Sequence, residues 1–319
     1  MLFCLPKKQQ ITMKKVILFL LFVAILTACT STPKAPFEPS QLEVTSGNLW
    51  RANIFSPELN ETIKVDVWTP NGYTTSKKYP VVYMHDGQNL FDANSTWNHQ
   101  AWEIDSVMGM LIVENKIRPA VVVGIHSVDT TRIGDLMPER VVEMTPPGKV
   151  RDFIDMMCRG QYRADEYLSF IVNTLKPTID SHFSTLTDRK STSIMGSSMG
   201  GLISIYGVTE YPDVFGAAVC MSTHWTGAIG DNADFPTAMK YYLMDKFPRN
   251  GDYLLYFDNG DCSYDSQYIP AYELMNSLFD FLGYHEGEKL KTGIFQGHSH
   301  SEQSWSQRVE IPLEFLYKR

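Results

Sequence analysis

Residues Ser191-Thr-Ser-Ile-Met-Gly-Ser-Ser-Met-Gly-Gly201 decide the fold of this chain. The pattern Gly-x-Ser-x-Gly runs from Gly196 to Gly200 and centres on Ser198. A serine hydroxyl is a weak nucleophile, so it has to project towards a base from a tight strand-to-helix turn, where side chains two residues to either side would clash. An apolar, β-prone run precedes the motif, and residues 201–211 have the apolar spacing of a helix. The sequence therefore predicts a strand, a nucleophile elbow at Ser198 and a helix.

Strand and helix patterns alternate on both sides of this motif. This alternation predicts an α/β fold in which helices cover both faces of a mostly parallel sheet, with the site at the carboxyl ends of the strands. Residues 131–163 have weak periodicity, and we expect them to form an irregular flap over that site. The expected strands are 48–55, 62–68, 79–85, 120–126, 192–197, 216–222, 253–257 and 293–296, and the expected helices are 102–114, 164–182, 200–210, 270–283 and 304–318.

Composition narrows the class of protein. The chain has 319 residues, of which 44% are hydrophobic, which is enough for one large core. The formal net charge is −8 and no basic run occurs beyond the N-terminus, which excludes nucleic acid as an expected partner. Cys158, Cys220 and Cys262 lack metal-ligand or disulfide-framework spacing, so we expect neither a metal site nor a disulfide framework. The serine chemistry expected below implies no cofactor.

The N-terminus has the pattern of an export signal. A charged start at Met13-Lys-Lys15 leads into an apolar run that ends at Leu26 and is too short to span a membrane comfortably. The run closes on Leu26-Thr-Ala-Cys29, which resembles the lipobox of bacterial lipoproteins. We therefore expect lipid on Cys29 and attachment to the cell envelope. The expected organisation is a signal peptide at 1–29, a flexible Ser/Thr/Pro-rich tether at 30–40 and the folded domain at 41–319.

A catalytic serine needs a base, an acid that orients the base, and donors for an oxyanion. The base is expected directly after the last strand, where His298 and His300 compete on composition alone. The acid is expected after the preceding strand, where spacing cannot choose between the candidates, which are Asp258, Asp261 and Asp265.

The oxyanion donors are expected from two backbone segments. One is the amide of Met199, which directly follows the serine. The other is an amide of His85-Asp-Gly-Gln-Asn89, where the glycine lets the backbone turn towards the serine. Three tryptophans are candidates for lining the substrate pocket, namely Trp97, Trp102 and Trp225.

Four motifs together resemble the putative esterase family. This family includes enterochelin esterase-like proteins, feruloyl and acetylxylan esterases, S-formylglutathione hydrolase and mycolyltransferases. The resemblance covers roughly residues 65–316 and implies an α/β-hydrolase fold. The motifs are His85-Asp-Gly-Gln-Asn-Leu-Phe-Asp92, Val122-Val-Gly-Ile125, Met195-Gly-Ser-Ser-Met-Gly-Gly-Leu202 and His300-Ser-Glu-Gln-Ser-Trp-Ser-Gln-Arg308.

The resemblance also implies roles for individual residues. The family's histidine stands five residues before a tryptophan, which matches His300 and Trp305. The family's acid loop places the acid at Asp265, although two loop positions depart from the pattern and leave Asp261 as an alternative. The family's Asp-Gly-x element maps the second oxyanion amide to Gln88.

The expected function is hydrolysis of carboxylic esters through an acyl-enzyme on Ser198, acting on acetyl or feruloyl esters of carbohydrates. A catecholate siderophore esterase is the alternative, because such a substrate is anionic and a basic pocket would favour it. Arg132, Arg140, Arg151 and Arg163 could supply such a pocket. An acyltransferase and a non-catalytic ligand-binding lipoprotein are less favoured. The expected partners are an ester of a small molecule or oligosaccharide and, through the lipid, a membrane.

Overall fold

The fold is built on a single twisted sheet. The computed structural model describes residues 37–230, 232–249 and 251–319, so the predictions for residues 1–29 and for most of the tether lie outside the described residues. The described residues form one compact unit. The strands are β1 (Glu38–Pro39), β2 (Asn48–Ser56), β3 (Glu61–Thr69), β4 (Val81–Met84), β5 (Val121–Ile125), β6 (Thr192–Ser197), β7 (Ala217–Met221), β8 (Leu254–Gly260) and β9 (Leu290–Phe295).

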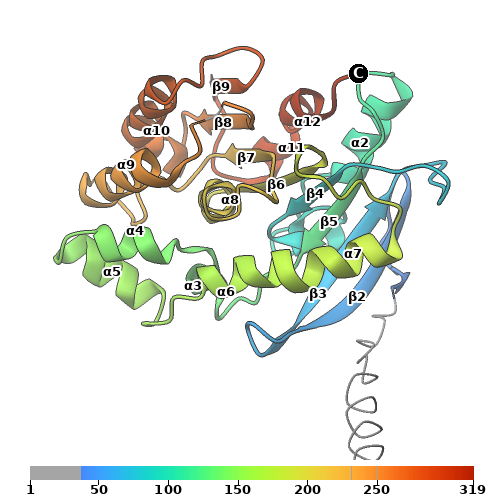
Figure 1. Ribbon diagram of the computed structural model, residues 1–319, viewed down its shortest axis with the longest axis horizontal. Helices are drawn as coiled ribbons and strands as arrows, with labels where there is room; N and C mark the ends of the chain where they lie inside the picture. The colour runs from blue at the N-terminus through green and yellow to red at the C-terminus, as the bar shows by residue number, and fades with distance from the viewer. Residues whose placement is uncertain (1–36, 231, 250) are drawn as a thin grey trace, which may run out of the picture. The chain divides into compact units, whose positions relative to one another are not determined.

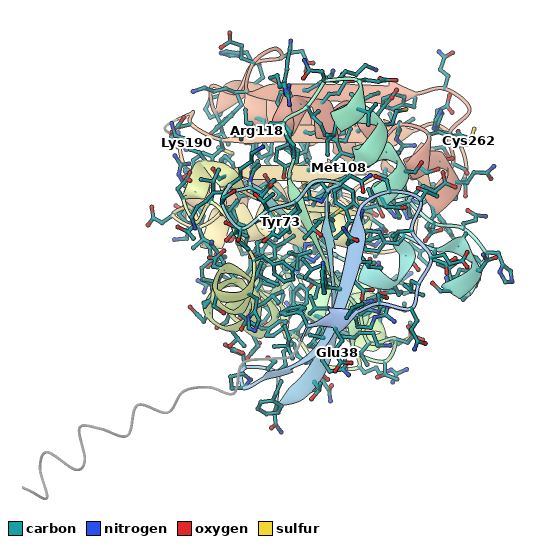
Figure 2. All side chains as sticks on the ribbon, turned by 90° about the vertical axis from the view of Figure 1, so that its right-hand side faces the viewer. Glu38, Tyr73, Met108, Arg118, Lys190 and Cys262 are labelled. Carbon is teal, nitrogen blue, oxygen red and sulfur yellow. The ribbon has the colours of Figure 1, made fainter. Side chains whose placement is uncertain are left out.

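The strand order confirms the predicted mostly parallel sheet. The order is β1-β2-β3-β5-β4-β6-β7-β8-β9. The pairs at the β1 end, up to β3 with β5, are antiparallel, and all pairs from β5 to β9 are parallel. The central strands are buried on both faces, as Val-Val-Tyr-Met of β4 and Val-Val-Val-Gly-Ile of β5 predict. Figure 2 shows Glu38, on edge strand β1, well separated from Cys262, which follows β8 near the opposite edge.

The helices connect successive strands and cover the sheet (Figure 1). They are α2 (Ile104–Val113), α3 (Arg132–Leu136), α4 (Glu139–Met144), α5 (Lys149–Met157), α6 (Ala164–Ser169), α7 (Lys176–His182), α8 (Met199–Glu210), α9 (Asp234–Lys246), α10 (Tyr264–Phe281), α11 (Glu302–Ser306) and α12 (Glu310–Tyr317). Short 3-10 turns occur at η1 (Gly87–Asn89), η2 (Ala93–Ser95) and η4 (Arg189–Ser191), and a π-helical turn occurs at η3 (Phe170–Leu175).

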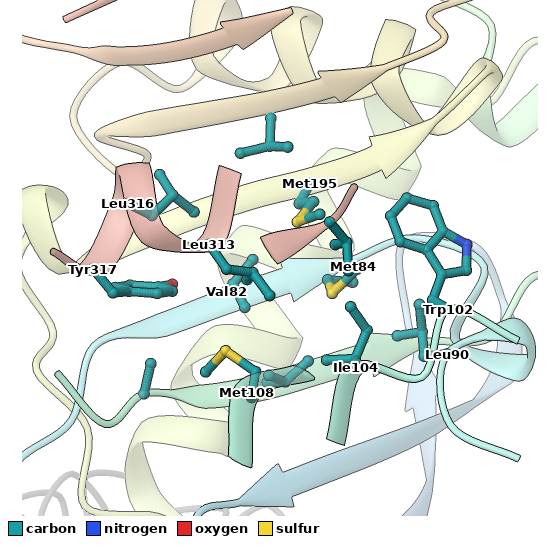
Figure 3. Packing of buried hydrophobic residues seen from close by; sticks show 14 of the residues in the cluster. Val82, Met84, Leu90, Trp102, Ile104, Met108, Met195, Leu313, Leu316 and Tyr317 are labelled. Carbon is teal, nitrogen blue, oxygen red and sulfur yellow. The ribbon is translucent and has the colours of Figure 1, made fainter. Parts of the chain in front are cut away.

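One face of the sheet packs on α2 and α12. Because successive side chains of a strand point to opposite faces, Val82 and Met84 of β4 lie on the same face as Met195 of β6. Figure 3 shows these side chains packed against Met108 of α2 and Leu313 of α12. This packing fixes the carboxyl ends of the central strands beneath the loops that follow them.

The other face packs on the helices α6, α8 and α10. A Cβ atom at Gly207 of α8 would lie 3.2 Å from side chains of both Ile194 of β6 and Leu168 of α6, so these elements meet closely there. On α10, the Phe279 ring lies 4.8 Å from the Phe257 ring of β8. The helix α8 therefore rests on β6, the strand that leads into it.

Three expected elements differ from the structure. Residues 131–163 are not irregular, because they contain the helices α3, α4 and α5. The helix expected from Pro270 begins six residues earlier, at Tyr264, and carries Pro270 in its interior. The helix expected at 304–318 is divided into α11 and α12 by the turn at 307–309. In the described ranges, none of the helices combines the length and apolar character that a membrane span requires.

Candidate active site

The backbone turns sharply at Ser198, between β6 and α8. Ser198 has φ 56° and ψ −121°, outside the regions that L-residues favour, and its N–H is held by the Met221 carbonyl at 2.9 Å. A Cβ atom at Gly196 would lie 2.7 Å from the carbonyl carbon of Gly200, and one at Gly200 would lie 3.3 Å from Cβ of His85. Close contact therefore requires a glycine at 196, a side chain at 200 would press on His85, and the turn places the Ser198 side chain at the carboxyl edge of the sheet.

An imidazole and a carboxylate come together beside this turn. His300 lies in the loop after β9, and Asp265 lies in the first turn of α10 after β8. The His300 Nδ1–H donates to Asp265 Oδ1 at 2.6 Å, and Asp265 is fully buried. Because Ser198 and His300 line the same pocket, the structure gathers all three side chains at the carboxyl ends of parallel strands.

The competing residues have other partners. Asp258 is buried in an ion pair, with its Oδ2 accepting from Arg308 Nε at 3.0 Å. Asp261 is partly exposed and its carboxylate accepts from the Gly297 N–H at 2.8 Å. The ring of His298 faces the Ser304 carbonyl at 3.2 Å. Asp265, and not Asp258 or Asp261, is therefore the aspartate that contacts His300.

Two backbone amides near Ser198 have unused donors. Asp86 adopts φ 55°, and a Cβ atom on the following Gly87 would lie 2.6 Å from the carbonyl carbon of Gly124. This tight contact fixes the turn that carries Gln88, whose side chain also bonds Ser127 at 2.7 Å. In the part of the chain that the structure describes, the N–H groups of Gln88 and Met199 have no hydrogen-bond partner. Both amides are thus available to an oxyanion.

The pocket around these groups has a volume of about 490 Å³. Arg132 lines it and donates to both carboxylate oxygens of Asp86, at 2.6 and 2.7 Å. Burial alone would raise the pKa of Asp86, but the contact with Arg132 outweighs burial and lowers the pKa. With Asp129 and Glu302 also on the lining, three carboxylates face one guanidinium, so the pocket is not basic.

The other arginines of the basic-pocket hypothesis, Arg140, Arg151 and Arg163, are also paired with acids. Arg140 contacts Asp165 and Glu210, each at 3.3 Å. Arg163 contacts Asp135 at 2.8 Å and also bonds Glu61. The remaining arginine named in the basic-pocket hypothesis, Arg151, lies 3.5 Å from Asp155. Among these four arginines, Arg132 alone lines the pocket that holds Ser198.

Two of the three candidate tryptophans line the pocket. Trp97 lies between η2 and His99 and is 85% exposed, whereas Trp102 is buried with its ring 5.5 Å from that of Trp305. The expectation that Trp225 lines the pocket is corrected by the structure. Trp225 is fully buried, and its ring packs on that of Phe257 at 5.8 Å.

The loop that carries Trp97 is tied to the turn that carries His300. Glu302 accepts from Asn98 Nδ2 at 2.9 Å and from Asn89 Nδ2 at 3.3 Å. Glu302 is two residues after His300, and Asn98 directly follows Trp97. The hydrogen bond between Asn98 and Glu302 therefore connects the loop of the exposed indole to the loop of the imidazole.

The structure adds a tyrosine and a histidine that the sequence did not indicate. The Tyr268 hydroxyl donates to His224 Nδ1 at 2.6 Å and also interacts with the Ser198 hydroxyl. Burial lowers the pKa of His224 to about 4, so its ring is neutral at physiological pH. Tyr268 is three residues after Asp265, a spacing that places both on one face of a helix. The spacing of Asp265 and Tyr268 did not indicate a shared face, because the expected helix begins only at Pro270.

A model of the family described as putative esterase matches residues 56–307. The endo-1,4-beta-xylanase/feruloyl esterase of Xylanibacter ruminicola is 25% identical over 209 residues, which cover 63% of this chain and 25% of that protein. Similar solved structures are the enterobactin esterase of Shigella flexneri (17% identity, 89% of this chain, 63% of that chain, TM-score 0.62) and the ferulic acid esterase of Anaeromyces mucronatus (16% identity, 87% of this chain, 94% of that chain, TM-score 0.59). This chain thus spans a quarter of the xylanase/feruloyl esterase and less than two thirds of the enterobactin esterase. The structures confirm the α/β-hydrolase fold.

We predict that His85 makes stability depend on pH. It is buried, its Nδ1 bonds the Tyr167 hydroxyl at 2.8 Å, and burial lowers its pKa to about 4. An unfolded histidine titrates near about 6.5, so the unfolded chain binds more protons and stability falls as pH drops from about 6.5 to 4, by up to about 3 kcal/mol for this residue. In His85→Gln, the free energy of unfolding should therefore fall less steeply over this range, measured by urea denaturation.

The matched control is His285→Gln, because the His285 side chain is 70% exposed. It should leave the slope as it is in the unmodified protein. Equal slopes in the unmodified protein and His85→Gln would contradict the prediction.

Proposed function

This chain belongs to the putative esterase family, and we propose that it hydrolyses a carboxylic ester through an acyl-enzyme formed on Ser198. The observation that supports this most directly is the bond of 2.6 Å between His300 and Asp265, in a pocket shared with Ser198. The unused amides of Gln88 and Met199 supply the remaining group that acyl transfer requires. The proposed chemistry uses side chains and backbone alone.

In the proposed mechanism, the Ser198 hydroxyl oxygen attacks the acyl carbon while His300 takes the hydroxyl proton. Asp265 holds the Nδ1–H tautomer, which leaves Nε2 as the base, and stabilises the imidazolium that forms. The amides of Met199 and Gln88 donate to the oxyanion. Collapse of the tetrahedral intermediate expels the alcohol, which takes its proton from His300. Water then attacks the acyl-enzyme with His300 again as base, which releases the acid and restores Ser198.

The proposed substrate is a neutral ester of a carbohydrate. Three carboxylates and one already paired guanidinium line the pocket, so an anionic catecholate would be repelled rather than attracted. An exposed indole at Trp97 offers a flat apolar surface beyond the reacting groups. Such a surface suits a sugar or feruloyl ring, which agrees with the names of the relative from Xylanibacter ruminicola and the structure from Anaeromyces mucronatus.

Matched substitutions test the proposed roles. Ser198→Ala should lower kcat by at least about 10⁴-fold, and Asp265→Asn by about 10⁴-fold because the wrong imidazole tautomer is favoured. Ser197→Ala and Asp261→Asn should stay within about tenfold of the unmodified protein, since neither side chain contacts the imidazole. The measurement is steady-state hydrolysis of p-nitrophenyl acetate together with thermal unfolding.

The two histidines give a parallel comparison. His300→Ala should abolish turnover, and His298→Ala should retain most of it. The reverse pattern, or collapse in Asp261→Asn with near-normal turnover in Asp265→Asn, would refute the assignment. Failure of a fluorophosphonate to label Ser198 would instead indicate a binding protein on a hydrolase scaffold.

Trp97 tests the substrate class. Trp97→Ala should raise KM about tenfold for acetylated or feruloylated xylo-oligosaccharides, a loss of about 1.4 kcal/mol, and leave kinetics with p-nitrophenyl acetate unchanged. Trp97→Phe keeps an aromatic ring, so its KM for the xylo-oligosaccharides should lie between those of the unmodified protein and Trp97→Ala. A catecholate trilactone should be a poor substrate for all three proteins. Equal effects of Trp97→Ala on both classes of ester, or a preference for the trilactone, would contradict this proposal.

We propose further that lipid on Cys29 anchors the domain to the cell envelope. The support is the signal-like run that ends in Leu26-Thr-Ala-Cys29. The full-length protein should incorporate labelled palmitate and partition into detergent, and Cys29→Ala should do neither. Equal labelling of both proteins would exclude the anchor.

A further inference from the structure

Ser222 occupies a strained position directly after β7. It has φ 42°, a left-handed conformation that L-residues rarely adopt, and it is fully buried. Its N–H is held by Asp258, through the carbonyl at 3.0 Å and through Oδ1 at 3.1 Å. The backbone therefore fixes where the Ser222 hydroxyl lies.

The Ser222 hydroxyl has one possible direction for its proton. Its oxygen accepts from Arg308 Nη2 at 2.7 Å and from Trp305 Nε1 at 3.0 Å. A hydroxyl oxygen has two lone pairs, and these two donors occupy both. The single O–H must then point at its third neighbour, Asp265 Oδ2, at 2.5 Å.

Arg308 is itself held rigidly. It is 1% exposed and donates to both oxygens of Asp258, from Nε at 3.0 Å and from Nη2 at 3.1 Å. Its Nη2 also lies 3.9 Å from Asp265 Oδ2, so its positive charge acts on that carboxylate without a direct hydrogen bond. Asp258, a candidate for the acid on sequence, thus serves to orient the guanidinium.

We propose that Ser222 and Arg308 are positioning residues that fix the rotamer and the charge of Asp265, and through it the orientation of His300. This inference rests on the proposed function. One oxygen of Asp265 is taken by His300, and the other by Ser222 and by the Gly260 N–H at 2.8 Å. The carboxylate therefore cannot rotate without breaking three hydrogen bonds. Part of its negative charge is also drawn towards Arg308 and away from the imidazole.

Loss of the Ser222 donor should have two effects on catalysis. The carboxylate gains freedom to turn, which lowers the fraction of His300 that is correctly oriented. The carboxylate also keeps more negative charge on the oxygen that faces His300, so a protonated imidazole persists to higher pH. Several charged or titratable groups surround His300. They are Asp265, Tyr264 and Tyr268 of α10, His224 after β7, Asp258 and Arg308 behind the carboxylate, and His85, Asp86, Asp129, Arg132 and Glu302 around the pocket.

The test compares Ser222→Ala with Ser56→Ala in the full chain. Ser56 is a matched control, because it is fully buried, donates to Glu58 Oε2 at 3.0 Å and accepts from the Leu59 N–H, but lies on β2, far along the sheet from β7. Hydrolysis of p-nitrophenyl acetate is measured from pH 5 to 9, with thermal unfolding of each variant.

For Ser222→Ala we expect kcat to fall about 10- to 100-fold with KM within about twofold, and the acid limb of kcat/KM to move to higher pH by about half a unit. Ser56→Ala should lower the Tm and leave kcat and the pH profile unchanged. If Ser222→Ala does not fold, the same measurements are made on Ser222→Cys. Because the thiol keeps a weak donor, its fall in kcat and its shift of the acid limb should be smaller.

In whichever variant folds, kcat within about twofold of the unmodified protein together with an unmoved acid limb would overturn the inference. A fall in kcat matched by an equal fall in Ser56→Ala would also overturn it, because that pattern reports general destabilisation. Failure of the proposed function is recognised separately. In that case the unmodified protein neither hydrolyses esters nor reacts with a fluorophosphonate at Ser198.

Discussion

The contact between Gly196 and Gly200 across the elbow is the constraint on which the site depends. The strand β6 can enter α8 directly only if the two backbones approach more closely than any side chain allows, and the turn between them then takes the conformation observed at Ser198. Strain of this kind persists only where surrounding structure holds it, here through the Ser198 N–H bond to Met221 and the packing of α8 on β6. Ser198 therefore owes its position to the core beneath it.

Beside the elbow, the polar groups of the site form a chain that runs from the partly buried His300 into the fully buried interior. His300 contacts Asp265, Asp265 contacts Ser222, and Ser222 contacts a buried Arg308–Asp258 pair. Each member has its hydrogen-bonding capacity filled by the next, which is the condition under which buried polar groups lend rigidity. The outer edge of the pocket differs, since Trp97 is largely exposed to solvent. The groups proposed for the chemistry and the indole proposed for substrate contact thus differ sharply in exposure.

The sequence was most informative where short-range backbone rules apply. The strand at 192–197 and the sheet class follow from local patterns, because glycine spacing and alternating apolar runs act over a few residues. The choice of Asp265 over Asp261 depended on the family resemblance. The contact of Asp265 with His300 could not be predicted, because α10 begins at Tyr264 and the proline at 270 had indicated a later start for this helix. The contacts of Ser222 and Tyr268 could not be predicted from the sequence for a related reason. Their partners are 43 and 44 residues away in the chain, and long-range pairing leaves no local trace. Trp225 shows the converse, because an aromatic residue after a strand end belongs to the core as readily as to a pocket.

The bonds from Glu302 to Asn98 and Asn89 have a consequence for how this scaffold could change its substrate. The loop at 92–100 presents Trp97, and in most enzymes such a loop could be exchanged freely for one of another length or composition. Here the loop is fastened to the turn that carries His300, so a replacement that lacked a donor at the Asn98 position would leave Glu302 held by Asn89 alone. Grafting a new specificity loop onto this protein therefore means transplanting its asparagine anchor together with the loop. Natural divergence of the loop would face the same restriction at Asn98.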